Sequence, residues 1–268
     1  MRLAILTNSS IRHKYLANEL YKSILSFDPG SSVVVTSELA PDSNKPRVEL
    51  SPLIEDHFKL RYATEAEMFD YNDFFLAPVL PLPYRELNSE YVCEVLEKFN
   101  PEVVVVFGSS IIKKPLLSLL PAGKTFNLHL GLSPYYRGSG TNFWPFVNKE
   151  LEYVGSTIIY LDAGVDTGDI LCHVTPEIEI GDNVHTVGCK VIKSSVNTLK
   201  EIIKTTMLGK TLPRTKQWTP TSPRYYKSKD FNELALKQYY RNLKEGLITN
   251  YLKNNPKPKK IINFDLNL

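Results

Sequence analysis

The sequence predicts an α/β fold in which a mostly parallel sheet is flanked by helices, and three observations predict it. The 268 residues are 43% hydrophobic, enough for one sizeable α/β domain with a smaller appendage. Short apolar runs recur along the chain, among them Leu3–Leu6 and Glu102–Phe107. Stretches with helical periodicity separate these runs, and strands that alternate with helices are typical of parallel sheets.

The first 36 residues read as a strand, a helix and a second strand. Leu3–Leu6 has the composition of a buried strand, and apolar residues then recur every four positions over 16–24, as on one face of a helix. Asn8–Ser10 stands between them and carries side chains that favour a helix N-terminus. Val33–Thr36 follows as a strand. This β-α-β opening is Rossmann-like, although it lacks a Gly-x-Gly-x-x-Gly pattern.

The turn after the first strand is a candidate phosphate site. Backbone N–H groups at Ser9 and Ser10 would face a ligand there, as at other helix N-termini. Arg12 and His13 occupy the first helical turn, where a positive charge is unfavourable unless an anion lies nearby. A substrate phosphate would be that anion. The alternative is that both are exposed polar side chains on the helix surface.

The remaining elements follow in order along the chain. Residues 37–90 are predicted to be mostly irregular, with one short helix near 64–75 and a proline-rich segment at 77–83. Further elements are a helix at about 89–99, the strand Glu102–Phe107, a short helix from Pro115, the strands Phe126–His129, Tyr153–Leu161 and Asp169–Thr175, and a long amphipathic helix from about Val184 to Gly209.

The composition changes near residue 210. Thr211–Ser228 is rich in Pro, Thr, Arg and Tyr, and Phe231–Leu252 has a helical pattern again. We therefore predict a main domain over 1–210 and a small, mainly helical C-terminal extension over 211–268. The basic run Lys253–Lys260 is expected to be a solvated tail.

A candidate active site is encoded near the middle of the chain. Asn127 and His129 would leave the same face of a strand, because side chains at i and i+2 do so. Ligands of open α/β sheets bind at the carboxyl ends of such strands. Asp166 lies downstream, in a turn dense in Gly and Asp. An amide donor beside a base and a carboxylate suits a reaction at a carbonyl group.

With these residues the chain resembles the formyltransferases that use 10-formyltetrahydrofolate. Their pattern is Asn-x-His, then a Leu-Pro loop with Arg-Gly, then Leu/Val-Asp-x-Gly. Three segments match in order, namely Asn127–His129, Arg137–Gly138 and Val165–Gly168. The chain departs from the usual His-x-Ser-Leu-Leu-Pro pattern at Gly131 and Ser133.

The resemblance implies the formyltransferase fold and an N-formyltransferase activity with 10-formyltetrahydrofolate as co-substrate, residues 1–210 being the catalytic domain. It makes Asn127, His129 and Asp166 the catalytic trio. It also implies a pterin pocket formed by Phe107, Gly108, Ser109, Ile111, Ile112, Asp162 and Val165. For the apolar members of that set, packing against the sheet is the alternative role.

The reaction class leaves the amine acceptor open, because relatives formylate methionyl-tRNA, glycinamide ribonucleotide or nucleotide-linked amino sugars. The short, helical extension disfavours tRNA, and Asn8–Ser10 in place of a glycine-containing turn disfavours the ribonucleotide. Gly140–Trp144 resembles an Asn-Phe-Trp segment of the sugar enzymes, in which Phe143 is expected to pack. The residues expected to contact the acceptor are Ser9, Ser10, Arg12, His13, Arg137 and Trp144.

We therefore expect a nucleotide-linked amino sugar of surface polysaccharide synthesis as the acceptor. Formylation of methionyl-tRNA or of glycinamide ribonucleotide stays open as an alternative. So does a folate- or nucleotide-binding protein of the same fold that performs no transfer. Whether the chain forms a homodimer also stays open.

Charge and composition argue against several other classes. The net charge of +3 does not indicate a nucleic-acid binder. The longest apolar runs are far shorter than the roughly 18 residues of a membrane span, and no export signal is visible. Cys93, Cys172 and Cys189 are too scattered for a disulfide framework or a metal site. These observations predict a cytoplasmic protein without membrane, nucleic acid or metal.

Overall fold

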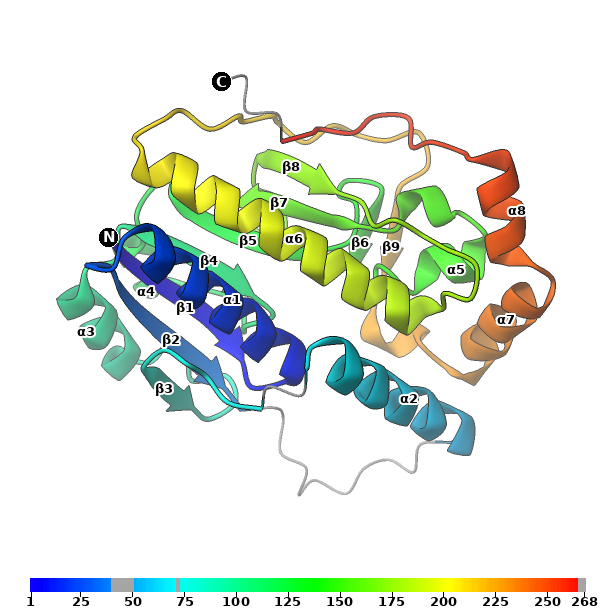
Figure 1. Ribbon diagram of the computed structural model, residues 1–268, viewed down its shortest axis with the longest axis horizontal. Coiled ribbons are helices and arrows are strands. Elements are labelled where there is room, and N and C mark those ends of the chain that lie inside the picture. Colours follow the sequence, from blue (N-terminus) through cyan, green and yellow to red (C-terminus); the bar gives the residue numbers. More distant parts are fainter. Residues whose placement is uncertain (40–50, 71–72, 265–268) are drawn as a thin grey trace.

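The computed structural model describes residues 1–39, 51–70 and 73–264. Its main sheet has the strand order β3-β2-β1-β4-β5-β7-β8 (Figure 1). The strands are β1 (Arg2–Asn8), β2 (Ser32–Glu38), β3 (Val79–Leu82), β4 (Val103–Phe107), β5 (Thr125–Leu130), β7 (Ser156–Tyr160) and β8 (Ile170–Val174). A second, small ladder pairs β6 (Tyr136–Gly138) with β9 (Arg224–Tyr226).

The main sheet is mostly parallel, as predicted. Strand β1 pairs in parallel with β2 and β4, β2 with β3, and β4 with β5. Only the last two strands, β7 and β8, add antiparallel pairs among the described residues. The α/β class is therefore confirmed.

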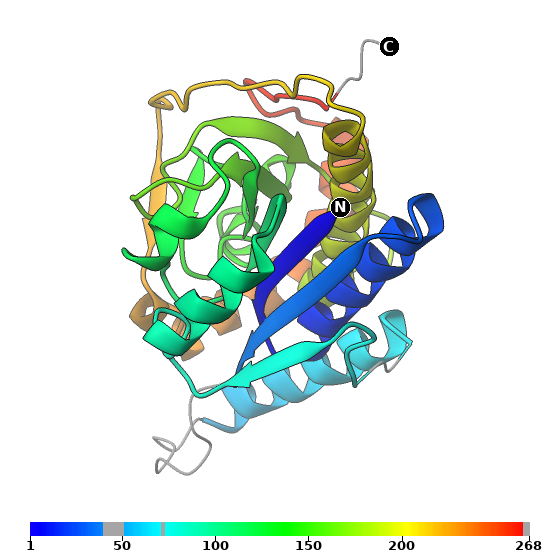
Figure 2. The same ribbon diagram turned by 90° about the vertical axis from the view of Figure 1, so that its left-hand side faces the viewer.

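Helices cover both faces of the sheet (Figure 2). One face carries α1 (Ile11–Phe27), α2 (Pro52–Met68) and α6 (Val184–Met207), and the other carries α3 (Glu90–Phe99) and α4 (Leu116–Leu119). The remaining helices are α5 (Trp144–Asn148), α7 (Glu233–Lys244), α8 (Leu247–Asn254) and the 3₁₀ turns η1 (Leu151–Tyr153) and η2 (Ser228–Asp230). In the described part of the chain, no helix has the length and apolar character that crossing a membrane requires.

The pleat of the central strands decides which side chains face which layer. In β4, Val103 and Val105 pack in the cluster that includes α1 and α6, whereas Val104 packs in the cluster on the other face. This strand is apolar throughout because both of its faces are buried. In β5, Phe126 and Leu128 face α1 and α6. The alternate residues of β5 therefore point to the opposite face.

Helix α2 corrects the prediction of a mostly irregular segment with a short helix near 64–75. The helix follows Ser51, has proline in its first turn and ends before Asp70, whose φ is 54°. Its buried side chains, His57, Thr64 and Glu65, are all polar, so no apolar periodicity marks it. Residues 71–72 of the predicted helix lie outside the described residues.

The proline-rich segment at 77–83, which was predicted to be irregular, contains strand β3. Strand β3 lies at the edge of the sheet, where Pro81 stands opposite Ser37 of β2. Proline is tolerated on an edge strand because its missing N–H removes no bond from the interior of the ladder.

Residues after 210 pack along β8, the other edge of the sheet. Thr215 exchanges backbone hydrogen bonds with Ile170 at 2.7 and 2.8 Å, and Ile262 accepts from the backbone N–H of His173 at 2.7 Å. These segments cover an edge that would otherwise expose unpaired backbone groups. The lysines of the basic run 253–260 are exposed, as expected of a solvated tail, but its backbone is held at Lys260, whose carbonyl accepts a hydrogen bond from Tyr135 at 3.0 Å.

The side chain of His173 joins this C-terminal segment to the sheet. Its Nδ1 accepts from the backbone N–H of Ile262 at 2.9 Å, so Nε2 carries the ring proton and donates to the carbonyl of Ser133 at 2.6 Å. Burial lowers the pKa of His173, and the Ser133 hydrogen bond offsets this only in part. The folded protein therefore holds a neutral imidazole at this position.

We expect the thermal unfolding midpoint to fall as the pH drops below the ordinary histidine pKa of about 6.5. The unfolded chain binds a proton at His173 in that range and the folded chain does not, so stability present above this pH is lost below it. His173→Gln should cost about 1–3 kcal/mol at pH 7.5, because it disturbs two buried hydrogen bonds. It should also flatten the pH dependence measured between pH 7.5 and 5. Equal slopes for the two proteins would contradict this account.

Candidate active site

A cavity of about 700 Å³ lies at the carboxyl ends of β4 and β5, beside the start of α1. Its lining comes from two groups of elements. One comprises the loop after β4, with residues 106–112, and the turn between β7 and β8, with residues 161–166. The other comprises the starts of α1 and α6, part of α2 and the loop 138–143. The site thus lies where the strand ends of an open α/β sheet place ligands.

Asn127, His129 and Asp166 all line this cavity. Asn127 Nδ2 donates to Asp166 Oδ1 at 3.0 Å, and His129 Nδ1 lies 3.2 Å from Asp166 Oδ2. Two residues of one strand face thus bind the two oxygens of one carboxylate. The Nε2 atom of His129 is buried and has no hydrogen-bond partner within the described chain.

The Asp166 carboxylate is anionic at neutral pH. Burial would raise the pKa of Asp166, but the hydrogen bond and charge of His129, the hydrogen bond of Asn127 and the charge of Arg137 together lower it below its ordinary value. The backbone of Asp166 has a φ of 53°, in the left-handed region that aspartate tolerates better than most residues. This geometry turns the carboxylate back toward β5.

Gln217, from the segment after residue 210, holds this turn in place. Its Nε2 donates to the carbonyls of Asp166 and Gly168, each at 2.8 Å. Its Oε1 accepts from Arg137 Nη2 at 2.6 Å. Arg137 therefore acts through Gln217 and its charge on Asp166, and it does not line the cavity. Nothing in the sequence around Gln217 signals this role.

Gly131, which replaces a serine of the resembling family, leaves room beside the imidazole. Its φ is 144°, and a Cβ atom there would lie 2.6 Å from Thr141 Cβ and 3.0 Å from His129 Nε2. A side chain at this position would crowd the unpartnered nitrogen, so the glycine is required where the loop 138–143 approaches β5.

The residues expected to form a pterin pocket are brought together. Phe107, Gly108, Ser109, Ile111, Ile112, Asp162 and Val165 all line the cavity. Ile111 and Val165 are 56% and 63% exposed, so packing alone does not explain them. Phe107 and Ile112 are buried in the sheet's two apolar clusters and also line the cavity, so they pack against the sheet as the alternative role expected.

The expected acceptor contacts are only partly brought together. Ser9 and Ser10 do not line the cavity. The N–H of Ser9 donates to the Glu38 carbonyl at 3.1 Å, and that of Ser10 to Asn8 Oδ1 at 3.0 Å. Both N–H groups are already hydrogen-bonded within the protein, so Ser9 and Ser10 do not form the phosphate site expected at the first turn.

Arg12 and His13 do line the cavity, and the alternative of two exposed polar side chains is wrong. His13 is buried, and burial, followed by the charges of Arg12 and Arg61, lowers its pKa well below the ordinary value. Arg12 pairs with Glu65 of α2. The anion expected beside the first turn of α1 is therefore provided by the protein itself, as the carboxylate of Glu65.

Trp144 and Phe143 exchange the roles expected of them. Trp144 is buried, stacks on Tyr226 with ring centroids 3.9 Å apart, donates to the Ser139 carbonyl at 2.9 Å and does not line the cavity. Phe143 lines it instead, one position earlier in the same turn. Further residues line the cavity although the sequence did not indicate them, namely His57, Phe58, Arg61, His185 and Phe231.

Within the ranges 1–39, 51–70 and 73–264, no group of three or more His, Cys, Asp or Glu side chains is arranged to hold a metal ion.

Comparison with known proteins places this geometry in a family. A family model described as Formyl transferase matches residues 39–203, more than half of the chain. Methionyl-tRNA formyltransferase of Caldanaerobacter subterraneus subsp. tengcongensis is 35% identical over 126 residues, which are 47% of this chain and 40% of that protein. The chain thus spans less than half the length of the curated relatives it matches.

Solved structures share the fold over a larger part of their length. A sugar N-formyltransferase from Shewanella sp FDAARGOS_354 superposes with a TM-score of 0.58 at 16% identity, covering 90% of this chain and 87% of the other. A formyltransferase from Anoxybacillus kamchatkensis, solved with UDP-4,6-dideoxy-4-formamido-L-AltNAc and tetrahydrofolate, gives 0.52 at 18% identity over 93% and 95% of the two chains. With the family match and the shared fold, the chain belongs to the formyl transferase family.

Proposed function

We propose that the protein transfers the formyl group of 10-formyltetrahydrofolate to a primary amine, specifically to the amino group of a nucleotide-linked amino sugar. The observation that carries this proposal is the convergence of Asn127, His129 and Asp166 in one cavity, where His129 Nε2 has no hydrogen-bond partner among the described residues. Family membership supports the reaction type.

His129 is the proton carrier of the proposed reaction. Asp166 accepts the Nδ1–H of the neutral ring and so leaves the lone pair of Nε2 toward the cavity. Nε2 takes a proton from the attacking amine as the C–N bond to the formyl carbon forms. It then returns the proton to N10 of the folate as the bond between N10 and that carbon breaks. The products are a formamide and tetrahydrofolate, and His129 is neutral again.

Asn127 stabilises the negative charge that develops on the formyl oxygen. One N–H of its amide is directed at Asp166 Oδ1, which fixes the orientation of the amide. The second N–H is then available for the oxyanion. A donor fixed in this way before the reaction contributes more than a mobile one, because no reorganisation is needed as charge develops.

The folate fits the wall formed by the loop after β4 and the turn between β7 and β8. Ile111 and Val165 present exposed apolar surface there for a flat ring. Gly108 and Ser109 line the cavity beside them, and the Gly108 carbonyl already accepts from Asn8 Nδ2 at 3.0 Å. The folate supplies the activated formyl group, and this wall would hold it beside His129.

The opposite wall suits a nucleotide-linked sugar. Four neighbouring rings line the cavity here, and we call them the acceptor wall: His57, Phe58, Phe143 and Phe231. The centroid of the His57 ring lies 5.6–6.0 Å from the centroid of each phenylalanine ring. Rings of this kind bind bases and sugars by stacking. The shared fold with a structure that contains a UDP-linked formamido sugar supports the same acceptor class.

Methionyl-tRNA is the second candidate acceptor. The curated relatives that match by sequence are named methionyl-tRNA formyltransferases. A tRNA-linked amino acid and a nucleotide-linked sugar both present a primary amine, so the trio serves either. The distinction rests on the acceptor wall of the cavity.

Asn127→Ala and His129→Ala should each lower kcat by roughly 10²–10³. The first variant loses the N–H donor to the developing oxyanion, and the second loses the group that transfers the proton. Affinity for tetrahydrofolate, measured by calorimetry, should stay unchanged, since neither residue belongs to the folate wall. Asn250→Ala, on the exposed surface of α8, is the matched control and should behave like the native protein. Turnover that survives in His129→Ala would overturn the mechanism.

Gln217→Leu should lower kcat about tenfold with little change in KM for either substrate, because it releases the Asp166 turn without touching a substrate. Gln217→Asn, which keeps the amide on a shorter side chain, should retain more activity. An increase in KM with kcat unchanged would instead place Gln217 against a substrate.

The acceptor is identified by the release of tetrahydrofolate from 10-formyltetrahydrofolate in the presence of candidate amines. We expect release with nucleotide-linked 3-amino or 4-amino sugars and none with methionyl-tRNA or glycinamide ribonucleotide. Release that depends on methionyl-tRNA alone would replace the sugar by the second candidate. Folate binding without release for any amine would indicate a binding protein of the same fold.

A further inference from the structure

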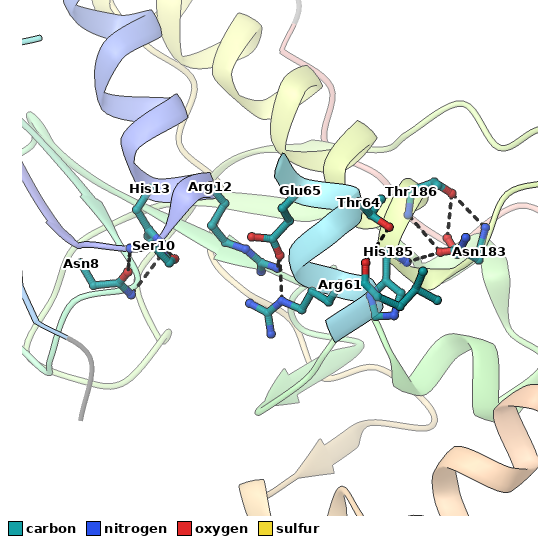
Figure 3. Close-up of polar contacts among 11 residues, drawn as sticks. Asn8, Ser10, Arg12, His13, Arg61, Thr64, Glu65, Asn183, His185 and Thr186 are labelled. Carbon is teal, nitrogen blue, oxygen red and sulfur yellow. Dashed lines mark hydrogen bonds and ion pairs between the residues drawn. The ribbon is translucent and has the colours of Figure 1, made fainter. Parts of the chain in front are cut away.

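Two arginines beside the acceptor wall share one carboxylate. Arg12 of α1 and Arg61 of α2 both bind Glu65 Oε1, the second through Nε at 2.8 Å (Figure 3). The Glu65 side chain is only 7% exposed, and that of Arg12 is 16% exposed. Three charged groups in a partly buried position thus carry one positive charge in excess.

Among the residues that the structure describes, no further charged group offsets this excess charge at the neighbouring imidazoles. The charged groups that act on the neighbouring imidazoles of His13, His57 and His185 are Arg12, Arg61 and Glu65. Burial, together with the charge of Arg61, lowers the pKa of His57 to about 4. Burial, followed by the charges of neighbouring groups that include Arg61 and Arg12, lowers the pKa of His185 to about 3. Both rings are therefore neutral and each retains one N–H donor.

Several buried polar atoms here have no partner among the residues that the structure describes. They are Arg12 Nε, His57 Nδ1 and His185 Nε2. His57 and His185 are 4% and 6% exposed, and their ring centroids lie 4.4 Å apart. An unpaired buried polar group costs about 1–3 kcal/mol, so native proteins rarely leave such groups without a ligand or water.

We propose that Arg12, Arg61, His57 and His185 bind a phosphate group of the acceptor, an inference that rests on the proposed nucleotide-linked acceptor. A guanidinium presents its N–H groups in a planar fork that matches phosphate oxygens, and the excess positive charge is neutralised by the anion. The two imidazoles, from α2 and α6, add N–H donors to the same site. All four residues line the cavity.

Side chains, and not a helix N-terminus, form this site. At the start of α6, Asn183 Oδ1 already accepts from the backbone N–H groups of His185 and Thr186, at 2.8 and 3.2 Å (Figure 3). At the start of α1, the N–H groups of Ser9 and Ser10 are bonded as well. The phosphate is therefore displaced from the first strand–helix turn toward α2.

The neighbouring rings extend the site to a nucleoside. Phe58, Phe143 and Phe231 line the cavity beside His57. A base or sugar stacked on them would have its phosphate next to Arg61, since Arg61 lies one helical turn beyond His57 on α2.

Calorimetric titration of the full chain with UDP, dTDP and pyrophosphate, and separately with tetrahydrofolate, tests this proposal. Arg61→Gln should weaken nucleoside diphosphate binding roughly 10- to 100-fold, because it removes a charged hydrogen-bond partner, and leave tetrahydrofolate binding unchanged. Lys59→Gln is the matched control, a cation on the same helix that is 72% exposed and does not line the cavity. If Arg61→Gln does not fold, Arg61→Lys, which keeps the charge and loses the fork, should show an intermediate loss.

Three results would overturn the phosphate site. These are no diphosphate or pyrophosphate binding by the native protein, native affinity in both Arg61 variants, and loss of tetrahydrofolate binding alone. The last would assign the cluster to the carboxylates of the folate's glutamate. Arg61-dependent diphosphate binding without formyl transfer to any amine would support the site while contradicting the proposed reaction. Formyl transfer to an amine that carries no phosphate, without any diphosphate binding, would support the proposed reaction and contradict the phosphate site.

Discussion

The candidate active site depends on one interaction, the binding of Asn127 and His129 by the two oxygens of the Asp166 carboxylate. The alternation of side chains along β5 places the amide and the imidazole on the same face, away from Phe126 and Leu128. The carboxylate fixes the orientation of the amide and the position of the ring proton together. The unpartnered Nε2 of His129 follows from this arrangement, and the proposed chemistry uses that nitrogen.

The C-terminal residues complete this arrangement and are more than an appendage. Gln217 holds both the Asp166 turn and Arg137, and Phe231 lines the cavity. The same part of the chain covers the β8 edge through Thr215 and Ile262. The position of the Asp166 carboxylate and the covering of the sheet edge therefore depend on the same part of the chain. The predicted domain boundary at 210 stays a prediction, and the contacts across it link both sides to one site.

The sequence predicted what depends on local pattern. Apolar runs such as Val103–Phe107 identified strands, and the i, i+2 spacing of Asn127 and His129 predicted that both side chains face one cavity. Helix α2 was missed because its buried side chains are polar, and one of them, Glu65, is held by Arg12, which is distant in sequence. Gln217, His57 and Arg61 were missed for the same reason: their roles arise from tertiary contacts. The expected contact at Trp144 failed because stacking on Tyr226 turned that ring away from the cavity.

The most direct test of the central claim is the protonation of His129, measured by ¹⁵N NMR of the histidine rings and assigned with His129→Gln. The account predicts that the neutral ring carries its proton on Nδ1, next to Asp166, and keeps a lone pair on Nε2. Replacing Asp166 by Asn should abolish this preference. A neutral ring protonated on Nε2 in the native protein would contradict the account, because the nitrogen at the cavity could not then accept the proton of an attacking amine.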